Sequence, residues 1–461
     1  GFTAMAANAL SPALLTALLT RHAPLRRLIV GYSGGLDSHV LLHLLARHRD
    51  LWPDRSLKAI YVDHGLQAAS AGWSRHCARV CQALQVPFQV LRVDASPDAG
   101  ESPEAAARRA RYGALAAELE ADAALLTAHH QDDQAETLLL QLLRGAGPRG
   151  LAAMPASARL GSGWLLRPLL EVGRAELSAY ARAHHLQWIE DQSNADPAFD
   201  RNYLRHLIMP LLDERWPAAA RNLARSARLC AETIDWLDAE AEADLAQAAT
   251  ARADALSIPA LRALREIRQR NLVRYWLRQL GLPVPDHRHL QHILHDHLTS
   301  GRDRRPCVRW PGGEIRRFRD RLHAMPPLSP HDASSVLTWR PEPQGWPPLD
   351  LPALGQLRMQ QTIGAGLRAD RLGDRPLTVR FRTGGERFQP AGRRHGQELK
   401  KLLLEAGIPP WERDRLPLLY EGGSLLAVVG LGIAAERAAA AGEIGWQTVL
   451  HSPSAAGSGI L

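Results

Sequence analysis

The sequence predicts an α/β protein that begins with a parallel sheet and continues into a mainly helical region and a small α+β region. Between residue 28 and about residue 145, short apolar runs alternate with helical stretches. This alternation is typical of a parallel sheet with helices on both faces. The composition agrees, because 46% of the 461 residues are apolar and 23% are charged, as in an ordinary globular chain of about three domains.

The first domain has four predicted strands, which are Leu28–Tyr32, Leu57–Val62, Phe88–Val93 and Ala123–Thr127. Each strand is followed by a predicted helix, and these are Ser38–Arg47, Gly72–Leu84, Ser102–Ala121 and Gln131–Arg144. Parallel strands present their carboxyl ends at one edge of the sheet, where ligands bind. We therefore expect three segments that follow strands to meet there: Ser33–Ser38, Asp63-His64 and Ala128-His129.

Changes in composition divide the rest of the chain. Residues 1–217 are the expected first domain, and residues 218–350 are an expected middle domain that is mainly helical. The middle domain ends in residues 326–350, where two Pro-Pro pairs predict a linker. We expect a C-terminal α+β domain over residues 351–450 and a tail over residues 451–461.

Charge and cysteine content narrow the class of protein. The net charge of +8 and the pI near 9.7 favour a polyanionic partner without identifying it. The four cysteines are too few and too scattered for a disulfide framework, which predicts a reducing, cytoplasmic location. No apolar run reaches 18 residues, so we expect no membrane partner.

The turn after the first strand reads Ser33-Gly34-Gly35-Leu36-Asp37-Ser38 and opens a helix. Glycines allow the backbone to approach a ligand closely, and a helix N-terminus favours an anion such as phosphate. Asp37 would be repelled by phosphates unless a divalent cation lies between them, so it predicts Mg²⁺. No lysine follows the last glycine, which excludes a Walker loop. The turn resembles the PP-loop of ATP pyrophosphatases.

A second cluster, His129–Thr137, follows the fourth strand and begins a helix. Asp133 and Glu136 are three residues apart, so their carboxylates share one helical face. With His129 and His130 they could hold Mg²⁺ or move a proton, although a capped helix with acidic residues at its N-terminus explains the pattern as well.

Two basic stretches complete the candidates. Arg108 and Arg111 are three residues apart on a predicted helix and could reach one anion, or could form a solvated basic face. Asp191–Asn194 precedes Arg201–Arg205, in which arginine and asparagine could contact phosphate or a base. Without a family resemblance the latter pair would be a capping turn followed by a basic helix.

Taken together, these motifs resemble the bacterial tRNA(Ile)-lysidine synthetases. The resemblance rests on the segments already quoted, on Leu143–Met154, and on the C-terminal segments Gly384–Phe388, Leu399–Leu403 and Ile408–Arg415. It covers most of residues 28–217 and 380–435, while the middle region matches by position and character only. It implies a Rossmann-like domain of the adenine nucleotide alpha hydrolase-like PP-loop type.

The resemblance implies a ligase that forms a carbon–nitrogen bond. ATP adenylates the carbonyl oxygen on carbon 2 of the wobble cytidine in a tRNA(Ile) with anticodon CAU, and pyrophosphate leaves. The amine of free L-lysine then displaces AMP to give lysidine, which changes the codon read from AUG to AUA. The implied cofactors are ATP and Mg²⁺, the partners are the tRNA and lysine, and the family also allows a homodimer.

The implied roles fall into three groups. The loop Ser33–Ser38 would hold the ATP phosphates, and the nucleotide pocket would be completed by Asp63, His64, Ala128 and His129. The catalytic group would comprise Asp37 on Mg²⁺, Arg111 or Arg108 at the adenylated intermediate, His130, and the lysine-orienting pair Asp133 and Glu136. The expected tRNA contacts are Arg201, Asn202, Arg205, Arg387, Arg393, Lys400, Lys401, Trp411 and Arg413.

Two alternatives remain open at this level. The C-terminal stretch could be a solvated basic surface with its aromatic residues in a core. A PP-loop tRNA thiolase is the rival activity, but such enzymes generally need a cysteine pair or an iron–sulfur site, and the sequence has no Cys-x-x-Cys.

Overall fold

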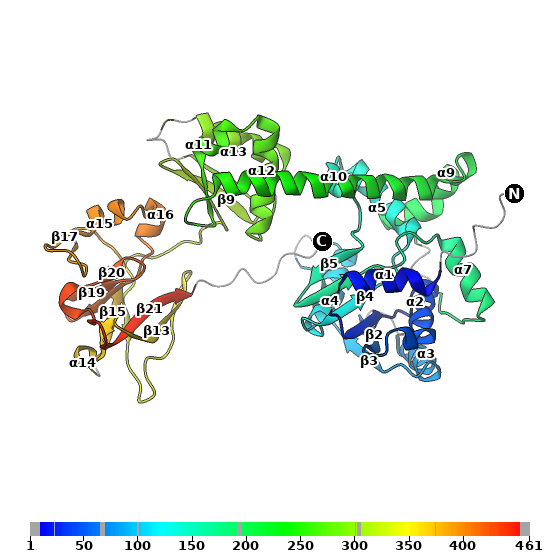
Figure 1. The fold of residues 1–461 in the computed structure, drawn as a ribbon, viewed down its shortest axis with the longest axis horizontal. Coiled ribbons are helices and arrows are strands. Elements are labelled where there is room, and N and C mark those ends of the chain that lie inside the picture. Colours follow the sequence, from blue (N-terminus) through cyan, green and yellow to red (C-terminus); the bar gives the residue numbers. More distant parts are fainter. Residues whose placement is uncertain are drawn as a thin grey trace. The chain divides into compact units, whose positions relative to one another are not determined.

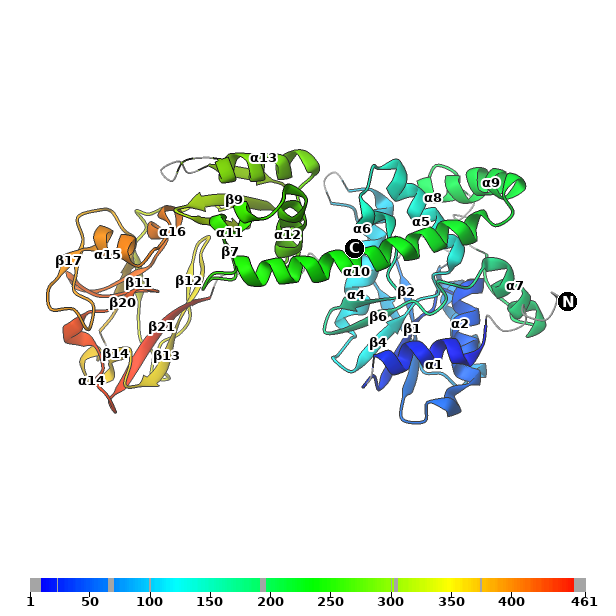
Figure 2. The same ribbon diagram turned by 45° about the horizontal axis from the view of Figure 1, so that its top comes forward.

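The computed structural model describes residues 10–22, 24–64, 70–98, 101–190, 196–299, 301, 306–373 and 375–451. The chain forms two compact units, of which the first ends at Glu240 and the second begins at Ala241. Helix α10 (Ala219–Ala248) begins in the first unit and ends in the second, and Figure 2 shows it as one unbroken helix. The segment Asp191–Asn194 and the tail beyond His451, both singled out above, lie outside the described residues.

A six-stranded sheet of order β3-β2-β1-β4-β6-β5 organises the first unit (Figure 1). Its strands are β1 (Arg27–Gly31), β2 (Ser56–Asp63), β3 (Phe88–Arg92), β4 (Ala123–Leu126), β5 (Ser157–Leu160) and β6 (Gly163–Leu166). All neighbours pair in parallel except β5 and β6. The four predicted strands and the parallel α/β architecture are confirmed. The β5–β6 hairpin was not predicted, and its turn places Gly161 at φ +55°.

Helices cover both faces of the sheet. The helices of this unit before α10 are α1 (Pro12–Arg21), α2 (Leu36–Arg47), α3 (Ser70–Ala83), α4 (Pro103–Ala117), α5 (Gln131–Leu143), α6 (Pro148–Leu151), α7 (Arg174–Ala183), α8 (Asp200–Tyr203) and α9 (Met209–Arg215), with a 3₁₀ turn η1 (Arg49–Leu51) and a π-helix η3 (Leu204–Ile208). Leu28 and Val30 of β1 join a core with α1, α2, α3 and α7, whereas Ile29 joins a core with α4. Alternate residues of one strand therefore face opposite helical layers, which hold the strand ends in place.

The first part of the second unit combines helices with an antiparallel sheet of order β7-β10-β9-β8. The strands are β7 (Ala255–Ser257), β8 (Cys307–Trp310), β9 (Gly313–Phe318) and β10 (Arg321–Met325), and the helices are α11 (Ile258–Ala263), α12 (Glu266–Gln279) and α13 (His287–Thr299). Helices α11 and α12 are separate because Leu264, which lies between them, adopts an extended conformation with ψ 148°.

The last part of the chain is an antiparallel β domain with short helices. One sheet has the order β11-β15-β18-β19-β20, with strands Leu337–Trp339, Leu377–Arg380, Leu418–Glu421, Ser424–Val428 and Gly432–Ile433. The other has the order β12-β13-β21-β14, with strands Leu349–Leu351, Gly355–Ile363, Ile444–His451 and Leu367–Arg368. A small ribbon and four short helical segments complete it: β16 (Arg387–Phe388), β17 (Gln397–Glu398), α14 (Ala369–Leu372), α15 (Leu399–Glu405), α16 (Pro410–Arg413) and η4 (Ala435–Arg437).

The expectation that residues 326–350 form a linker is wrong in part. Strand β11 pairs with β15, and β12, which begins at Leu349, pairs with β13, so this segment contributes to both C-terminal sheets. Trp339 is almost fully buried and its indole N–H donates to the Pro347 carbonyl at 2.7 Å. Prolines flank these short strands without interrupting their pairing, and apolar residues between them enter the core. Among the described residues, no helix is both long and apolar enough to cross a bilayer.

Candidate active site

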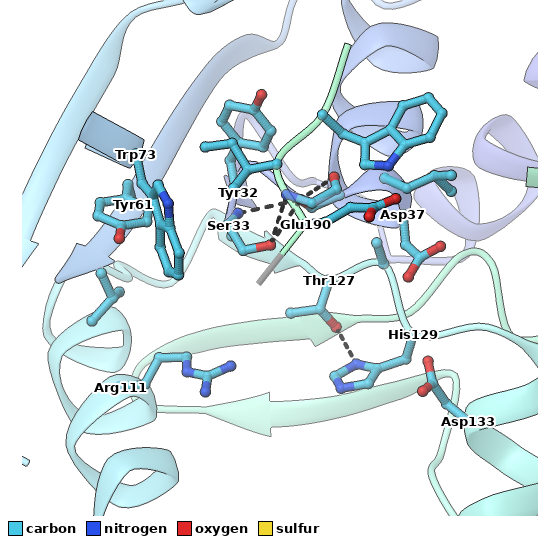
Figure 3. Close-up of a pocket in the computed structure, with 18 of the residues that line it drawn as sticks. Tyr32, Ser33, Asp37, Tyr61, Trp73, Arg111, Thr127, His129, Asp133 and Glu190 are labelled. Atoms are coloured by element: carbon cyan, nitrogen blue, oxygen red, sulfur yellow. Dashed lines mark hydrogen bonds between the residues drawn. The ribbon is translucent and has the colours of Figure 1, made fainter. Parts of the chain in front are cut away.

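A cavity of about 810 Å³ lies in the first unit at the carboxyl ends of β1, β2 and β4 (Figure 3). It brings together most members of the three segments that follow these strands. Its lining includes the predicted residues Ser33, Gly35, Leu36, Asp37, Ser38, His64, Arg111, Ala128, His129, Asp133 and Arg205. Asp63, Arg108, His130, Glu136, Arg201 and Asn202 do not belong to the lining.

The turn between β1 and α2 has the geometry of an anion cradle. Gly34 has φ +84°, and a Cβ there would lie 3.0 Å from Cys77 Sγ and 3.3 Å from Ile189 Cδ1. Ser33 N–H donates to Ser38 Oγ at 3.2 Å, which closes the turn. Because the first N–H groups of α2 have no partners within the helix, they are available to an anion at this point. Glycine is therefore required at position 34 for both conformation and space.

Asp37 lies in the first turn of α2, and its two carboxylate oxygens have different surroundings. Its Oδ2 lies 3.5 Å from His130 Nε2, whereas Oδ1 is buried and has no hydrogen-bond partner among the described residues. No group of three or more metal-ligating side chains occurs among the described residues. Mg²⁺ is commonly held by one or two carboxylates together with substrate phosphates. The unsatisfied oxygen of Asp37 fits that mode of binding.

The two neighbouring histidines differ in charge at neutral pH, because one ring is neutral and the other is a cation. Burial lowers the pKa of His129 to about 3, so its ring is neutral, and Nδ1 lies 2.9 Å from Thr127 Oγ1. Burial would also lower the pKa of His130, but the carboxylates of Asp132, Asp37 and Asp133 outweigh it and raise the pKa to about 10. His130 is therefore an imidazolium beside Asp37, and its charge state does not change near neutral pH.

Asp133 and Glu136 do not stand free. Arg205 donates from Nε and Nη2 to the two oxygens of Glu136 at 2.7 and 2.8 Å, and from Nη2 to Asp133 Oδ1 at 3.0 Å. Arg201 Nε donates to Glu136 Oε2 at 2.9 Å. We call these four residues the arginine clasp. The Glu136 carboxylate accepts three of these hydrogen bonds. Because Glu136 is also 1% exposed and outside the cavity lining, its carboxylate is not available to a ligand in the cavity.

Within the clasp, Asp133 remains ionised. Burial would raise its pKa, but His130 and Arg201 outweigh this and lower the pKa to about 2. The clasp places Arg201 and Arg205 against carboxylates of α5, which differs from the expectation that they contact tRNA. The sequence did not reveal this pairing because 65 to 69 residues separate Arg201 and Arg205 from Glu136.

The cavity distinguishes the two candidate arginines of α4. Arg111 lines the cavity, and Figure 3 shows it entering from α4, across from the turn that carries Ser33 and Asp37. Arg108 instead lies over the Tyr112 ring at 5.1 Å. Arg111 is therefore the arginine that can meet a ligand. Surrounding protein atoms lower its pKa through desolvation.

Several lining residues were not predicted from the sequence. They are contributed by β2, α3, α7, the segment after α7 and η3, and they include Tyr61, Trp73, Arg174, Ser178, Trp188, Glu190 and His206. None belongs to a motif with its own chemical signature. The local signals were positional, since Trp188–Glu190 lies directly before Asp191–Asn194 and His206 directly follows Arg201–Arg205.

The predicted tRNA contacts in the C-terminal domain fall into two groups. Arg387, Arg393, Lys400 and Lys401 are exposed. Trp411 instead packs edge-on against His323 and Phe318, with ring centroids 5.4 and 6.3 Å away, and Arg413 lies over the Phe318 ring. Phe388 is buried in the core. Trp411 is half-buried and has the Arg316 guanidinium 5.5 Å from its ring centroid, so these contacts hold it against β9 and β10.

Comparisons with known proteins agree with the geometry of the site. Residues 11–212 match a PP-loop domain, residues 256–323 a TilS substrate binding domain, and residues 377–450 a TilS substrate C-terminal domain. The chain is 45% identical over 402 residues to the tRNA(Ile)-lysidine synthase of Methylococcus capsulatus, covering 87% of this chain and 90% of that protein. It is 46% identical over 431 residues to the enzyme of the same name from Alkalilimnicola ehrlichii, covering 92% and 94%.

One solved structure similar to the chain is the U34-tRNA thiolase NcsA from Methanococcus maripaludis, which is 18% identical with a TM-score of 0.39. The likeness covers 47% of this chain and 77% of that chain, and it is too distant to support an inference about function.

Proposed function

The chain belongs to the tRNA(Ile)-lysidine synthase family of ligases, and from that premise we propose how its cavity carries out the reaction. The substrates are ATP, a tRNA(Ile) with anticodon CAU, and free L-lysine. The oxygen on carbon 2 of the wobble cytidine attacks the α-phosphorus of ATP and pyrophosphate leaves. The amine of lysine then attacks carbon 2, AMP departs with the oxygen, and the amine loses a proton.

The turn Ser33–Ser38 binds the ATP phosphates through its backbone N–H groups and its serine hydroxyls. Asp37 holds Mg²⁺, which neutralises phosphate charge when bound. The observation that carries this role is the buried, unpartnered Oδ1 of Asp37 at the mouth of the anion cradle. His130, as an imidazolium, fixes the orientation of the Asp37 carboxylate.

Arg111 supplies positive charge where the adenylated base carries its phosphate. It lines the cavity, and no hydrogen bond or ion pair holds its guanidinium among the residues that the structure describes. Positioned cations that meet developing phosphate charge are a principal source of catalysis in such transfers. His129, which is neutral, lines the same cavity and can hydrogen-bond the nucleotide.

For tRNA binding we propose the exposed basic residues Arg387, Arg393, Lys400 and Lys401 on β16, the loop that follows it, and α15. Lysine and arginine on a surface bind the phosphate backbone through charge, with an affinity that depends on salt. A reducing compartment such as the cytoplasm suits the four free cysteines.

The thiolase alternative is less well supported. Cys77 lies next to Gly34 of the PP-loop, but both Cys77 and Cys81 are completely buried. Burial raises the pKa of each thiol to about 12, so neither forms the thiolate that sulfur transfer requires.

The test is incorporation of labelled lysine into an unmodified tRNA(Ile) transcript bearing CAU, with ATP and Mg²⁺ and with elongator tRNA(Met) as control. We expect transfer to the first transcript only. Asp37→Ala should abolish both pyrophosphate release and lysine transfer, and full activity in this variant would contradict the role of Asp37. Pyrophosphate release without lysine transfer in the wild type would favour a different nucleophile.

A further inference from the structure

The proposed reaction needs a group in the cavity that recognises lysine. The two carboxylates expected to do so, Asp133 and Glu136, are already paired with arginines in the clasp. Glu136 is outside the cavity and accepts three hydrogen bonds from arginine. Asp133 lines the cavity, but both of its oxygens have partners. Oδ1 accepts a hydrogen bond from Arg205 Nη2 at 3.0 Å, and Oδ2 accepts one from the backbone N–H of His130 at 3.0 Å. Both carboxylates are already neutralised by neighbouring cations.

Three carboxylates line the cavity: Asp37, Asp133 and Glu190. Asp37 adjoins the His130 imidazolium and the phosphate cradle, and Asp133 belongs to the clasp. Glu190 differs from both, because its side chain is exposed to the cavity and has no ion pair or hydrogen bond among the described residues. Among the described residues it is therefore the lining carboxylate that no hydrogen bond or ion pair neutralises, and it lies outside the proposed Mg²⁺ site at Asp37.

Local structure holds Glu190 close to the site of chemistry. The neighbouring Ile189 donates its backbone N–H to the Gly34 carbonyl at 2.9 Å, and its side chain fills the space beside Gly34. This bond ties the segment Trp188–Glu190 to the PP-loop. In Figure 3 Glu190 lies on the side of Ser33 and Asp37, across from Arg111. Trp188 also lines the cavity and offers an apolar surface for a methylene chain.

The charges of the cavity indicate which ligand Glu190 meets. Arg111 and Arg174 line it as cations outside the clasp, which suits a triphosphate and an RNA phosphate. An unpaired carboxylate would repel those ligands but attract a cationic co-substrate. Lysine carries two ammonium groups, and the one that reacts must be neutral to attack, so the α-ammonium is the charged group left for recognition.

We propose that Glu190 binds the α-ammonium group of the lysine co-substrate and so determines amino-acid specificity, an inference that rests on the proposed function. In this arrangement the clasp positions α5 and the segment η3, while Glu190 and Trp188 receive the substrate amino acid.

Steady-state kinetics of lysine incorporation at saturating ATP, Mg²⁺ and tRNA test the proposal. Glu190→Gln keeps the size of the side chain and removes its charge. The KM for lysine should rise about 10- to 100-fold, as expected for loss of one charge-assisted hydrogen bond, while kcat changes much less. Glu171→Gln, at an exposed glutamate outside the cavity lining, is the matched control and should leave KM unchanged.

A second readout uses 6-aminohexanoate, which retains the reacting amine and the carboxylate but lacks the α-ammonium. The wild type should prefer lysine, and Glu190→Gln should lose most of that preference. An unchanged KM for lysine in Glu190→Gln, or a preserved preference, would overturn the inference. Loss of tRNA-dependent pyrophosphate release would also overturn it, by assigning Glu190 to the nucleotide. Failure of the wild type to incorporate lysine would instead contradict the proposed function.

Discussion

Removing the charge of Glu136 should unfold the first unit more easily, because the arginine clasp is an internal ion-pair network. In Glu136→Gln the amide has one acceptor oxygen. If that oxygen takes the place of Oε2, the Nε of Arg205 loses its partner, and if it takes the place of Oε1, two donors face the amide NH₂. Breaking one side of a buried ion pair costs about 3 to 5 kcal/mol. We expect the lower end, about 3 kcal/mol, because Asp133 still pairs with both arginines.

For a unit of this size, 1 kcal/mol lowers the unfolding midpoint by about 2 to 4 °C, so the expected loss is about 6 to 12 °C. Differential scanning calorimetry measures it, and the transition of the first unit is the one that ATP raises. Glu171→Gln, which removes an exposed pair with Arg228 at 3.7 Å, should cost less than about 0.5 kcal/mol.

If Glu136→Gln has an unfolding midpoint within 2 °C of wild type but no longer transfers lysine, the reasoning is refuted. Glu136 would then have a direct catalytic role. A double-mutant cycle with Arg205→Met gives an independent check. The double variant should lose less stability than the sum of the single variants, because each removes the same interaction.

Two further predictions concern pH and the C-terminal domain. The pKa of His130 is raised from 6.5 to about 10, so protonation of this histidine stabilises the fold fully below pH 6.5, and the stabilisation is lost as the pH rises through about 10. Urea unfolding without nucleotide at pH 6, 8 and 10 should show this decline, and a slope unchanged in His130→Gln would contradict it. In the C-terminal domain, Lys401→Glu should weaken tRNA binding and reduce its salt dependence by about one phosphate contact. Trp411→Ala should instead lower the unfolding midpoint of the second unit, since the ring packs against His323 and Phe318. If Trp411→Ala instead weakens tRNA binding and leaves stability unchanged, Trp411 contacts tRNA as the sequence predicted.

Local patterns in the sequence were sufficient for the architecture of the first unit. The apolar runs predicted β1 to β4, because a strand buried on both faces needs a continuous apolar stretch whatever surrounds it. The turn Ser33–Ser38 could also be predicted from the sequence. A glycine at positive φ and a helix N-terminus are both determined by residues that are neighbours in the chain. The strands β5, β6 and β11 were not predicted, because each has only three or four residues, and β6 and β11 are held by pairing with β4 and β15, which are distant in the sequence.

The sequence by itself determined the fold class, the family and the PP-loop turn Ser33–Ser38, all of which rest on residues close together in the chain. Only the tertiary structure decided the chemistry of the individual side chains. His129 and His130 are adjacent, yet burial makes one neutral, while carboxylates on α2 and α5 make the other a cation. Likewise, Glu136 is paired with arginines from a distant segment, whereas Glu190 lines the cavity without a hydrogen bond or ion pair to any described residue. The charge state of a side chain and its availability to a ligand depend on burial and on the charged groups that folding brings close to it. No local pattern in the sequence predicts either of them.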